Sequence, residues 1–202
     1  FMAWALARHG GEAGLKAAWG GAAAADDDWA AGVLGLRNLF DLTGKAPRPS
    51  GGEAARLADQ TRFLTETQRG FYAWAADLFR ELGIRSLTNA MNWRSADQVT
   101  LDDAERYSYG AMDVVAVNFY TGGAHQGENN GYRIDPGHTF TNGSVLRGTA
   151  PFPGALKQVA GHPLVVTETA WVHPNLYQAE GPFLAAAYTP MTGVDALYWF
   201  AF

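Results

Sequence analysis

The stretch HPLVVTETAW, from His162 to Trp171, decides the fold of this chain. Its apolar run from Leu164 to Thr167 is rich in β-branched residues and ends directly in a glutamate, Glu168. A short, continuously apolar run of this kind is typical of a parallel strand that is buried on both faces. We therefore predict a strand near residues 163–168 with Glu168 at its carboxyl end.

The same triplet Thr-Glu-Thr also occurs at Thr65–Thr67, with different neighbours. In residues 53–82 the apolar side chains recur at three-, four- and seven-residue steps, which predicts a long helix. Glu66 lies about 200° around this helix from the apolar stripe, because each residue advances the helix by about 100°. We predict that Glu66 occupies a solvated face, where it pairs with Arg62 or Arg69.

Three further segments predict strands, near residues 84–92, 113–120 and 194–201. Helical patterns separate the predicted strands, at residues 95–109, 154–161 and 180–193. Alternating strands and helices indicate parallel β/α units. The predicted fold is therefore α/β, with about four parallel strands in a partial TIM-type barrel and a mainly helical region over residues 1–83. A single domain over residues 1–202 is expected.

The helical region begins with an apolar pattern from Phe1 to Trp19, interrupted by the turn His9–Glu12. The acidic cluster Asp26–Asp28 is interpreted as a solvated helix cap, since aspartate favours helix N-termini. The helical pattern starts abruptly at the first residue, and no basic segment or cleavage signal accompanies it. We therefore expect that an upstream piece is missing.

Composition excludes several classes of protein. The chain has 202 residues, of which 48% are apolar and 17% charged, which describes a globular rather than a disordered protein. The net charge of −5, without a long Lys/Arg stripe, argues against nucleic acid and anionic membranes as partners. Cysteine is absent, which excludes disulfides and thiolate metal sites. No apolar run approaches the roughly 18–20 residues of a membrane span, so a soluble protein of unknown compartment is predicted.

Polar and aromatic side chains gather at the predicted carboxyl ends of the strands. They are Asn92, Trp93, Asn118, Tyr120, Glu168, Trp171 and Trp199. Because parallel β/α folds build their chemistry at this end of the sheet, we expect these residues to share one site. Aromatic faces stack on sugars and amides bond hydroxyls, which favours a neutral polyhydroxylated ligand. The alternative is that Glu168 is structural and pairs with Arg85 or Arg94.

The segment HPLVVTETAW resembles the seventh strand of the clan A glycoside hydrolases, which are retaining (β/α)8-barrel enzymes. The segments GIRSLTNAMNW, MDVVAVNFYTG and VDALYWFAF resemble the fifth, sixth and eighth strands. The beginning, FMAWALARHGGEAGLKAAWGG, resembles the helix after the fourth strand in β-galactosidases and their cellulase-type relatives. The resemblance covers the whole chain loosely and implies the C-terminal half of a barrel.

This resemblance also implies functional roles. Glu168 corresponds to the catalytic nucleophile, and the substrate is an oligo- or polysaccharide with a β-linkage, cleaved without a cofactor or metal. The residues expected to bind the sugar are Asn92, Trp93, Asn118, Tyr120, His125, Trp171 and Trp199. The alternative function is a non-catalytic carbohydrate-binding half-barrel. A serine hydrolase is disfavoured, because the chain has no Gly-x-Ser-x-Gly motif.

The chain departs from the family pattern in its acid/base. In clan A this residue is the glutamate of an Asn-Glu pair after the fourth strand, and this chain has no such dipeptide. A retaining mechanism needs two carboxyl groups about 5–5.5 Å apart. The missing half has been lost, or a second chain completes the barrel at the open sheet edge, or another carboxylate substitutes. Glu128 is the best substitute, ahead of Glu180 and Asp97.

Glu128 lies in a long loop that also contains His125, Asp135 and His138. These four side chains are of types that bind divalent ions, but their spacing fits no standard zinc pattern. We expect the histidines to bond substrate or backbone instead.

Overall fold

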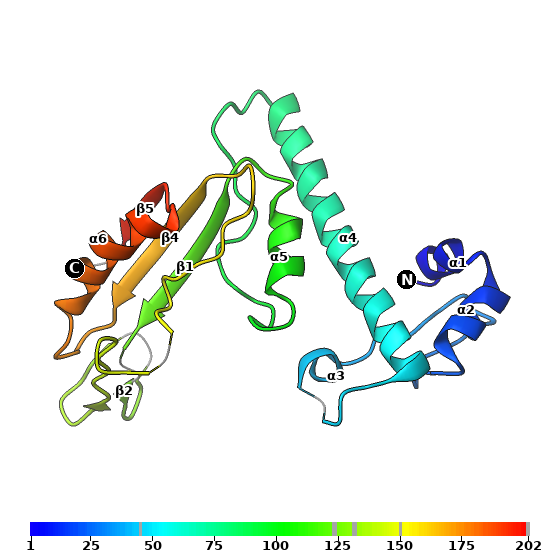
Figure 1. The fold of residues 1–202 in the computed structure, drawn as a ribbon, viewed down its shortest axis with the longest axis horizontal. Coiled ribbons are helices and arrows are strands. Elements are labelled where there is room, and N and C mark those ends of the chain that lie inside the picture. The colour runs from blue at the N-terminus through cyan, green and yellow to red at the C-terminus, as the bar shows by residue number, and fades with distance from the viewer. Residues whose placement is uncertain (45, 123–124, 131–132, 150, 201–202) are drawn as a thin grey trace. The chain divides into compact units, whose positions relative to one another are not determined.

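The computed structural model describes residues 1–44, 46–122, 125–130, 133–149 and 151–200 (Figure 1). The chain forms two compact units. Unit 1 comprises residues 1–83 and 96–111, and unit 2 comprises residues 84–95 and 112–202. The first boundary, after Gly83, coincides with the predicted end of the helical region, while a single domain stays a prediction.

Unit 1 is built from helices. They are α1 (Met2–His9), α2 (Glu12–Trp19), α3 (Leu39–Thr43), α4 (Gly51–Glu81) and α5 (Asp102–Tyr109). The predicted break between the first two helices is confirmed, and it occurs where Gly10 adopts a left-handed conformation with φ 69°. Within the described ranges, none of the helices is both long enough and apolar enough to cross a membrane.

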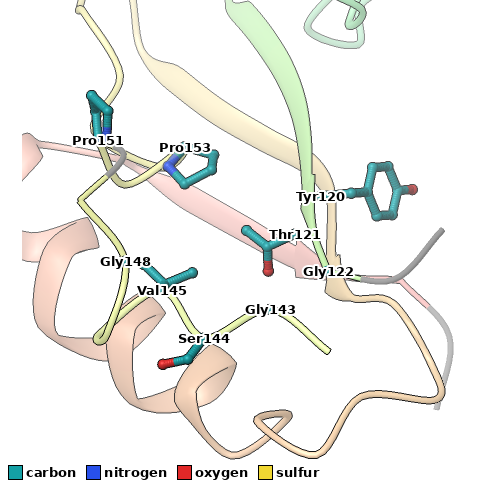
Figure 2. Close-up of a pocket in the computed structure, with 9 residues that line it drawn as sticks. All are labelled: Tyr120, Thr121, Gly122, Gly143, Ser144, Val145, Gly148, Pro151 and Pro153. Carbon is teal, nitrogen blue, oxygen red and sulfur yellow. The ribbon is translucent and has the colours of Figure 1, made fainter. Parts of the chain in front are cut away.

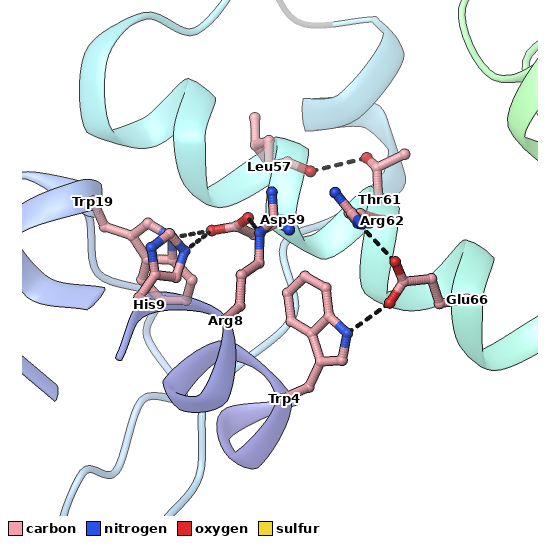
Figure 3. A network of polar contacts seen from close by, with 9 residues as sticks. All are labelled: Trp4, Arg8, His9, Trp19, Leu57, Asp59, Thr61, Arg62 and Glu66. Carbon is pink, nitrogen blue, oxygen red and sulfur yellow. Dashed lines mark hydrogen bonds and ion pairs between the residues drawn. The ribbon is translucent and has the colours of Figure 1, made fainter. Parts of the chain in front are cut away.

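A buried carboxylate ties α1 and α2 to α4 (Figure 3). Asp59 on α4 accepts hydrogen bonds from Arg8 Nε at 2.9 Å, from His9 Nε2 at 2.7 Å and from the indole of Trp19 at 2.8 Å. Burial favours the protonated form of Asp59, but the bonds from Trp19, His9 and Arg8 outweigh it and lower the pKa. The three donors therefore hold a charged aspartate among the helices.

Glu66, also on α4, lies in a more solvated place (Figure 3). Its carboxylate accepts a bond of 2.6 Å from Arg62 Nε, and its side chain is 41% exposed. The prediction of a solvated glutamate paired with Arg62 is confirmed. The indole of Trp4 is a second donor, at 2.8 Å. It was not predicted, because Trp4 lies on α1, 62 positions before Glu66 in the sequence.

The interpretation of Asp26–Asp28 as a helix cap is wrong. This cluster lies in a loop, and Asp28 forms an isolated antiparallel bridge with Val33. Both carboxylate oxygens of Asp27 accept bonds of 2.6 Å from the guanidinium of Arg56 on α4, whose side chain is fully buried. This bidentate bond is the main cause that lowers the pKa of Asp27 to about 2. The cluster thus anchors its loop to α4.

Unit 2 contains a parallel sheet. Its elements are β1 (Val115–Thr121), β2 (His125–Gln126), β3 (Thr139–Phe140), β4 (Leu164–Trp171), α6 (Glu180–Thr192) and β5 (Ala196–Trp199). Strands β1, β4 and β5 pair in parallel in that order, while β2 and β3 form a separate antiparallel pair (Figure 1). A mixed α/β fold with a parallel sheet is therefore confirmed.

The prediction of a strand over residues 84–92 is wrong. This segment contributes a single parallel bridge, from Asn89 to Val114. Its apolar residues Ile84 and Leu87 are 44% and 76% exposed, so they lack the two-sided burial that a central strand requires. At the other end of the sheet, residue 201 of the predicted strand 194–201 lies outside the described residues.

Two helix predictions also need correction. Residues 154–161 form an irregular segment with a turn at each end rather than a helix. A segment so short with glycine at both ends lacks the packing that offsets helix nucleation. Helix α5 begins at Asp102 rather than near residue 95. The residues before it form turns, and Asp97 accepts the backbone N–H groups of Val99 and Thr100 there.

Candidate functional site

The site lies in the carboxyl-terminal halves of β1 and β4. Asn118 of β1 lies opposite Glu168 of β4 in the parallel register. Two residues further along β1, the phenol of Tyr120 donates a hydrogen bond of 2.6 Å to Glu168 Oε2. The sheet therefore brings together two of the residues predicted to share a site. Tyr120 is next to the last residue of β1. Strand β4 continues past Glu168 to Trp171, so the prediction that this strand ends at Glu168 is wrong.

The pairing of β1 with β4 contains a bulge at Thr167. Val117 pairs with Val166, but the next residue, Asn118, pairs with Glu168, so Thr167 is the extra residue. The register of β4 with β5 also shifts between Val166 and Thr169. Bulges of this kind bend the strand and redirect side chains, and they are common beside active sites. The hydroxyl of Thr167 donates a bond of 2.5 Å to Asn118 Oδ1.

Three aromatic rings form a surface beside the carboxylate, which we name the aromatic surface: Trp93, Tyr120 and Phe200. Trp93 stacks on Tyr120 with ring centroids 5.9 Å apart, and Phe200 meets Tyr120 edge to face at 6.2 Å. Trp93 is 52% exposed and Phe200 is 53% exposed. The rings are therefore accessible to a ligand.

Phe200 was missed at the sequence level. Side chains alternate across a strand, so Phe200 and its neighbour Trp199 point to opposite faces of the sheet. Applying this alternation to the segment that ends in Tyr-Trp-Phe would have separated the two rings.

The environment of Tyr120 keeps its phenol protonated. Burial and the bond to the Glu168 carboxylate raise the pKa of Tyr120 to about 12, because both disfavour a phenolate at this place. At neutral pH, Tyr120 therefore acts as a hydrogen-bond donor to Glu168.

Trp171 does not line the site as predicted, while a sugar contact by half-buried Trp199 stays a prediction. Trp171 is 1% exposed, and its ring stacks on Trp199 with centroids 6.1 Å apart. Both rings close on Gly181 of α6, where an added Cβ would come within 2.7 Å of Trp199 and 2.8 Å of Trp171. The pair therefore packs the sheet against α6. The prediction of a sugar-binding role is wrong for buried Trp171, and the ring of Trp199 serves this packing contact.

The two predicted asparagines belong to the support of the site. Asn118 is 4% exposed, so its prediction as a direct sugar contact is wrong. Asn92 is half-buried, and its backbone carbonyl accepts the N–H of Asn118 at 2.6 Å. That bond fixes the segment carrying Trp93 beside β1, while a sugar contact by the Asn92 side chain stays a prediction.

The predicted loop residues organise the loop itself. His125 Nε2 contacts the carbonyl oxygens of Asn130 and Arg133, and His138 Nε2 contacts the carbonyl oxygen of Glu128. The two imidazoles stack with centroids 5.5 Å apart. The expectation of backbone bonding is confirmed, whereas a substrate contact by His125 stays a prediction. In the part of the chain that is described, no three or more His, Asp or Glu side chains form a group that could hold a metal.

The candidate acids are exposed or bond other residues. Glu128 is exposed, and Glu180 binds the hydroxyl of Ser144 at 2.6 Å and the N–H of Val145 at 2.7 Å. Asp97 belongs to unit 1, where it caps a turn. Among the described residues, Glu168 also makes no ion pair, so its predicted alternative pairing with Arg85 or Arg94 is wrong; its hydrogen-bond partner is Tyr120.

A pocket of about 240 Å³ lies beside the end of β1 (Figure 2). Its lining is Tyr120, Thr121, Gly122, Gly143, Ser144, Val145, Gly148, Pro151 and Pro153. Figure 2 shows the ring of Tyr120 directed away from the other labelled residues. The pocket therefore belongs to the loop after β1 and not to the contact between Tyr120 and Glu168.

Comparisons of this chain with protein-family models, curated proteins and solved structures find no match. The function is therefore argued from the residues of the site and from the resemblance of the strand sequences.

Proposed function

We propose that this chain carries the nucleophile half of a retaining glycoside hydrolase of clan A type, acting on a β-linked oligo- or polysaccharide. The observation that carries the proposal is the hydrogen bond of 2.6 Å between Tyr120 and Glu168, beside exposed aromatic rings at a strand end. The resemblance of HPLVVTETAW to a nucleophile strand supports the same assignment.

Glu168 would attack the anomeric carbon of the sugar. Its carboxylate oxygen forms a bond to C1 while the bond from C1 to the leaving oxygen breaks, and that oxygen departs with the electron pair. Water then attacks C1 of the glycosyl-enzyme, loses a proton, and releases the free carboxylate with net retention. The bond from Tyr120 occupies Oε2, which leaves the other carboxylate oxygen for attack.

The aromatic surface supplies the sugar contact. The exposed faces of Trp93 and Phe200 offer apolar area for the C–H faces of a pyranose. Stacking of this kind needs no charge on the ligand, so it suits a neutral carbohydrate. A neutral ligand also agrees with the absence of an ion pair at Glu168 among the described residues.

The acid/base would come from outside the described site. In this proposal the parallel sheet is part of a TIM-type barrel, completed by an upstream segment or by a second copy of the chain. The strand order leaves β5 at one end of the described sheet, while the outer edge of β1 bonds the segment 88–92. An unpaired strand edge favours association with further strands, so β5 is the edge at which the barrel would continue.

An activated substrate tests the nucleophile without requiring the acid/base. The leaving group of a 2,4-dinitrophenyl β-glycoside departs as a stable anion, so it needs no proton donor. Gluco, galacto and manno versions should be compared for the unaltered chain, Glu168→Gln and Glu66→Gln. We expect hydrolysis of at least one sugar to be abolished by Glu168→Gln alone. Equal rates for all three proteins would refute the proposal.

A non-catalytic carbohydrate-binding protein is the second candidate. It is favoured by one observation, that two of the candidate acids, Glu180 and Asp97, bond residues other than Glu168. This candidate predicts that oligosaccharides bind and quench tryptophan fluorescence while activated glycosides remain uncleaved. Hydrolysis of the activated glycoside by the unaltered chain through a covalent intermediate would exclude this candidate.

A further inference from the structure

We propose that Thr167 and Asn118 act as positioning residues, which hold the bulge of β4 so that Glu168 meets Tyr120. This inference rests on the proposed function for its catalytic meaning. The orientation of the Glu168 carboxylate toward Tyr120 can be measured without any turnover.

The bulge creates the need for such a device. Thr167 and Glu168 together lie opposite the single residue Asn118, so the regular ladder does not fix both of them. The hydroxyl of Thr167 donates to the carboxamide oxygen of that same opposing residue at 2.5 Å. This side-chain bond ties the two strands where their register shifts.

Burial defines the role of Asn118. The residue is 4% exposed, and its Nδ2 has no hydrogen-bond partner within the described part of the chain. A buried donor without a partner is unfavourable, so an apolar residue would suit this place better if packing alone mattered. The bond that Asn118 does make, from Thr167, is therefore the contact that accounts for an amide here. Because the side chain is covered, it acts on the site through Glu168 rather than on a ligand.

Thr169 provides a matched control on the same strand. It is fully buried, and among the residues that the structure describes its hydroxyl has no hydrogen-bond partner. Replacement of threonine by valine exchanges a hydroxyl for a methyl of similar size. The change therefore removes an interstrand bond at Thr167 and removes none at Thr169.

The direct test measures the ionisation of the Tyr120 phenol by NMR of a chain with ring-labelled tyrosine. The unaltered chain should titrate Tyr120 with a pKa of about 12, and Glu168→Gln should show how far the pKa falls without the carboxylate. We expect Thr167→Val to shift the pKa in the same direction as Glu168→Gln. Thr167→Ser, which retains the hydroxyl, and Thr169→Val should keep the original value.

Thermal melting accompanies each titration, and Asn118→Leu provides a second route if Thr167→Val fails to fold. It removes the acceptor of the same bond from the opposite strand, and the same fall in the Tyr120 pKa is expected. An unchanged Tyr120 pKa in the folded Thr167→Val or Asn118→Leu protein would overturn the positioning role. An equal fall in Thr169→Val would also overturn it.

A kinetic measurement separates this inference from the proposed function. With a dinitrophenyl β-glycoside, Thr167→Val should lower kcat by about tenfold to a hundredfold with little change in KM, because small misplacements of a reacting group are costly. Thr167→Ser should recover most of the rate. If the unaltered chain has no activity, the proposed function fails, while the Tyr120 titration still decides whether Thr167 and Asn118 aim the carboxylate. If activity is present and Thr167→Val retains it fully, the positioning role fails instead.

Discussion

The phenol of Tyr120 on β1 and the carboxylate of Glu168 on β4 meet across two parallel strands at 2.6 Å. The contact joins residues that are 48 positions apart, in the carboxyl-terminal halves of their strands. It gives Glu168 a neutral donor and an aromatic neighbour in place of a cation. That setting suits a nucleophile that must approach an uncharged sugar.

Replacing Tyr120 with phenylalanine should lower kcat for an activated β-glycoside by about tenfold, because loss of a hydrogen bond to a charged group costs roughly 1.5 kcal/mol or more. KM should change little, since the ring remains beside Trp93. Tyr198→Phe is the control, as Tyr198 lies on β5 and is 61% exposed. Equal losses in the two variants would contradict the role of the Tyr120 hydroxyl.

Trp93→Ala should weaken the binding of an oligosaccharide by about tenfold, because one exposed aromatic face is removed from the aromatic surface. Titration followed by calorimetry measures this change. Trp74→Ala is the matched control, since Trp74 is a 58% exposed tryptophan on α4 of unit 1. Binding that is insensitive to Trp93→Ala would remove this ring from the sugar site.

Asp59 and Glu66 form a matched pair on α4, since each accepts hydrogen bonds from an indole and an arginine (Figure 3). Asp59→Asn should destabilise unit 1 by about 3 kcal/mol or more, because a buried carboxylate pair is broken. Glu66→Gln should leave the melting temperature nearly unchanged, because that side chain is largely solvated. Thermal unfolding measures the loss of stability in each variant. A larger loss in Glu66→Gln than in Asp59→Asn would show that burial does not decide how much each carboxylate contributes to stability.

Acid should weaken the anchor between Asp27 and Arg56. The pKa of Asp27 is lowered from 3.8 to about 2, so the carboxylate contributes about 2 kcal/mol above pH 4. That contribution is lost as the pH falls through about 2, because the folded state must then bind the proton. Denaturant unfolding at pH 5, 3 and 2 should show the stability difference between the unaltered chain and Asp27→Asn shrinking.

Asp26→Asn is the control for this pH dependence. Asp26 is an exposed neighbour in the same cluster, so its replacement should leave the unfolding free energy unchanged across the series. A constant difference between Asp27→Asn and the unaltered chain at all three pH values would contradict the assignment.

Local patterns in the sequence predicted the elements that are regular in the structure. Strand β4 was recognised because its apolar run is continuous, and α4 because its apolar residues repeat with helical spacing. Segment 84–92 has only scattered apolar residues, and their burial depends on neighbouring strands, which the segment itself does not encode. Residues 154–161 likewise have a helical pattern but lack the packing that a short helix needs.

The site was predicted only in part, because local patterns show where strands lie but not which residues meet across them. Glu168 and Tyr120 were found because each follows a recognisable apolar run, although β4 continues past Glu168 to Trp171. The bulge at Thr167 changes which residue lies opposite which, and no local pattern announces it. Trp171 and Trp199 were assigned to the sugar because they follow strand ends, whereas their rings pack against α6. The bond between Asp27 and Arg56 depends on residues 29 positions apart, beyond the reach of periodicity.

The central claim is that Glu168 forms a covalent bond to the anomeric carbon of a sugar. A 2-deoxy-2-fluoro-β-glycosyl fluoride tests it most directly, because fluoride leaves readily and the fluorine at C2 slows hydrolysis of the glycosyl-enzyme. After incubation and proteolysis, mass spectrometry should find one glycosyl group on the peptide that contains Glu168, and none in Glu168→Gln. A chain that stays unlabelled with gluco, galacto and manno reagents, or that carries the label on another residue, would contradict the assignment.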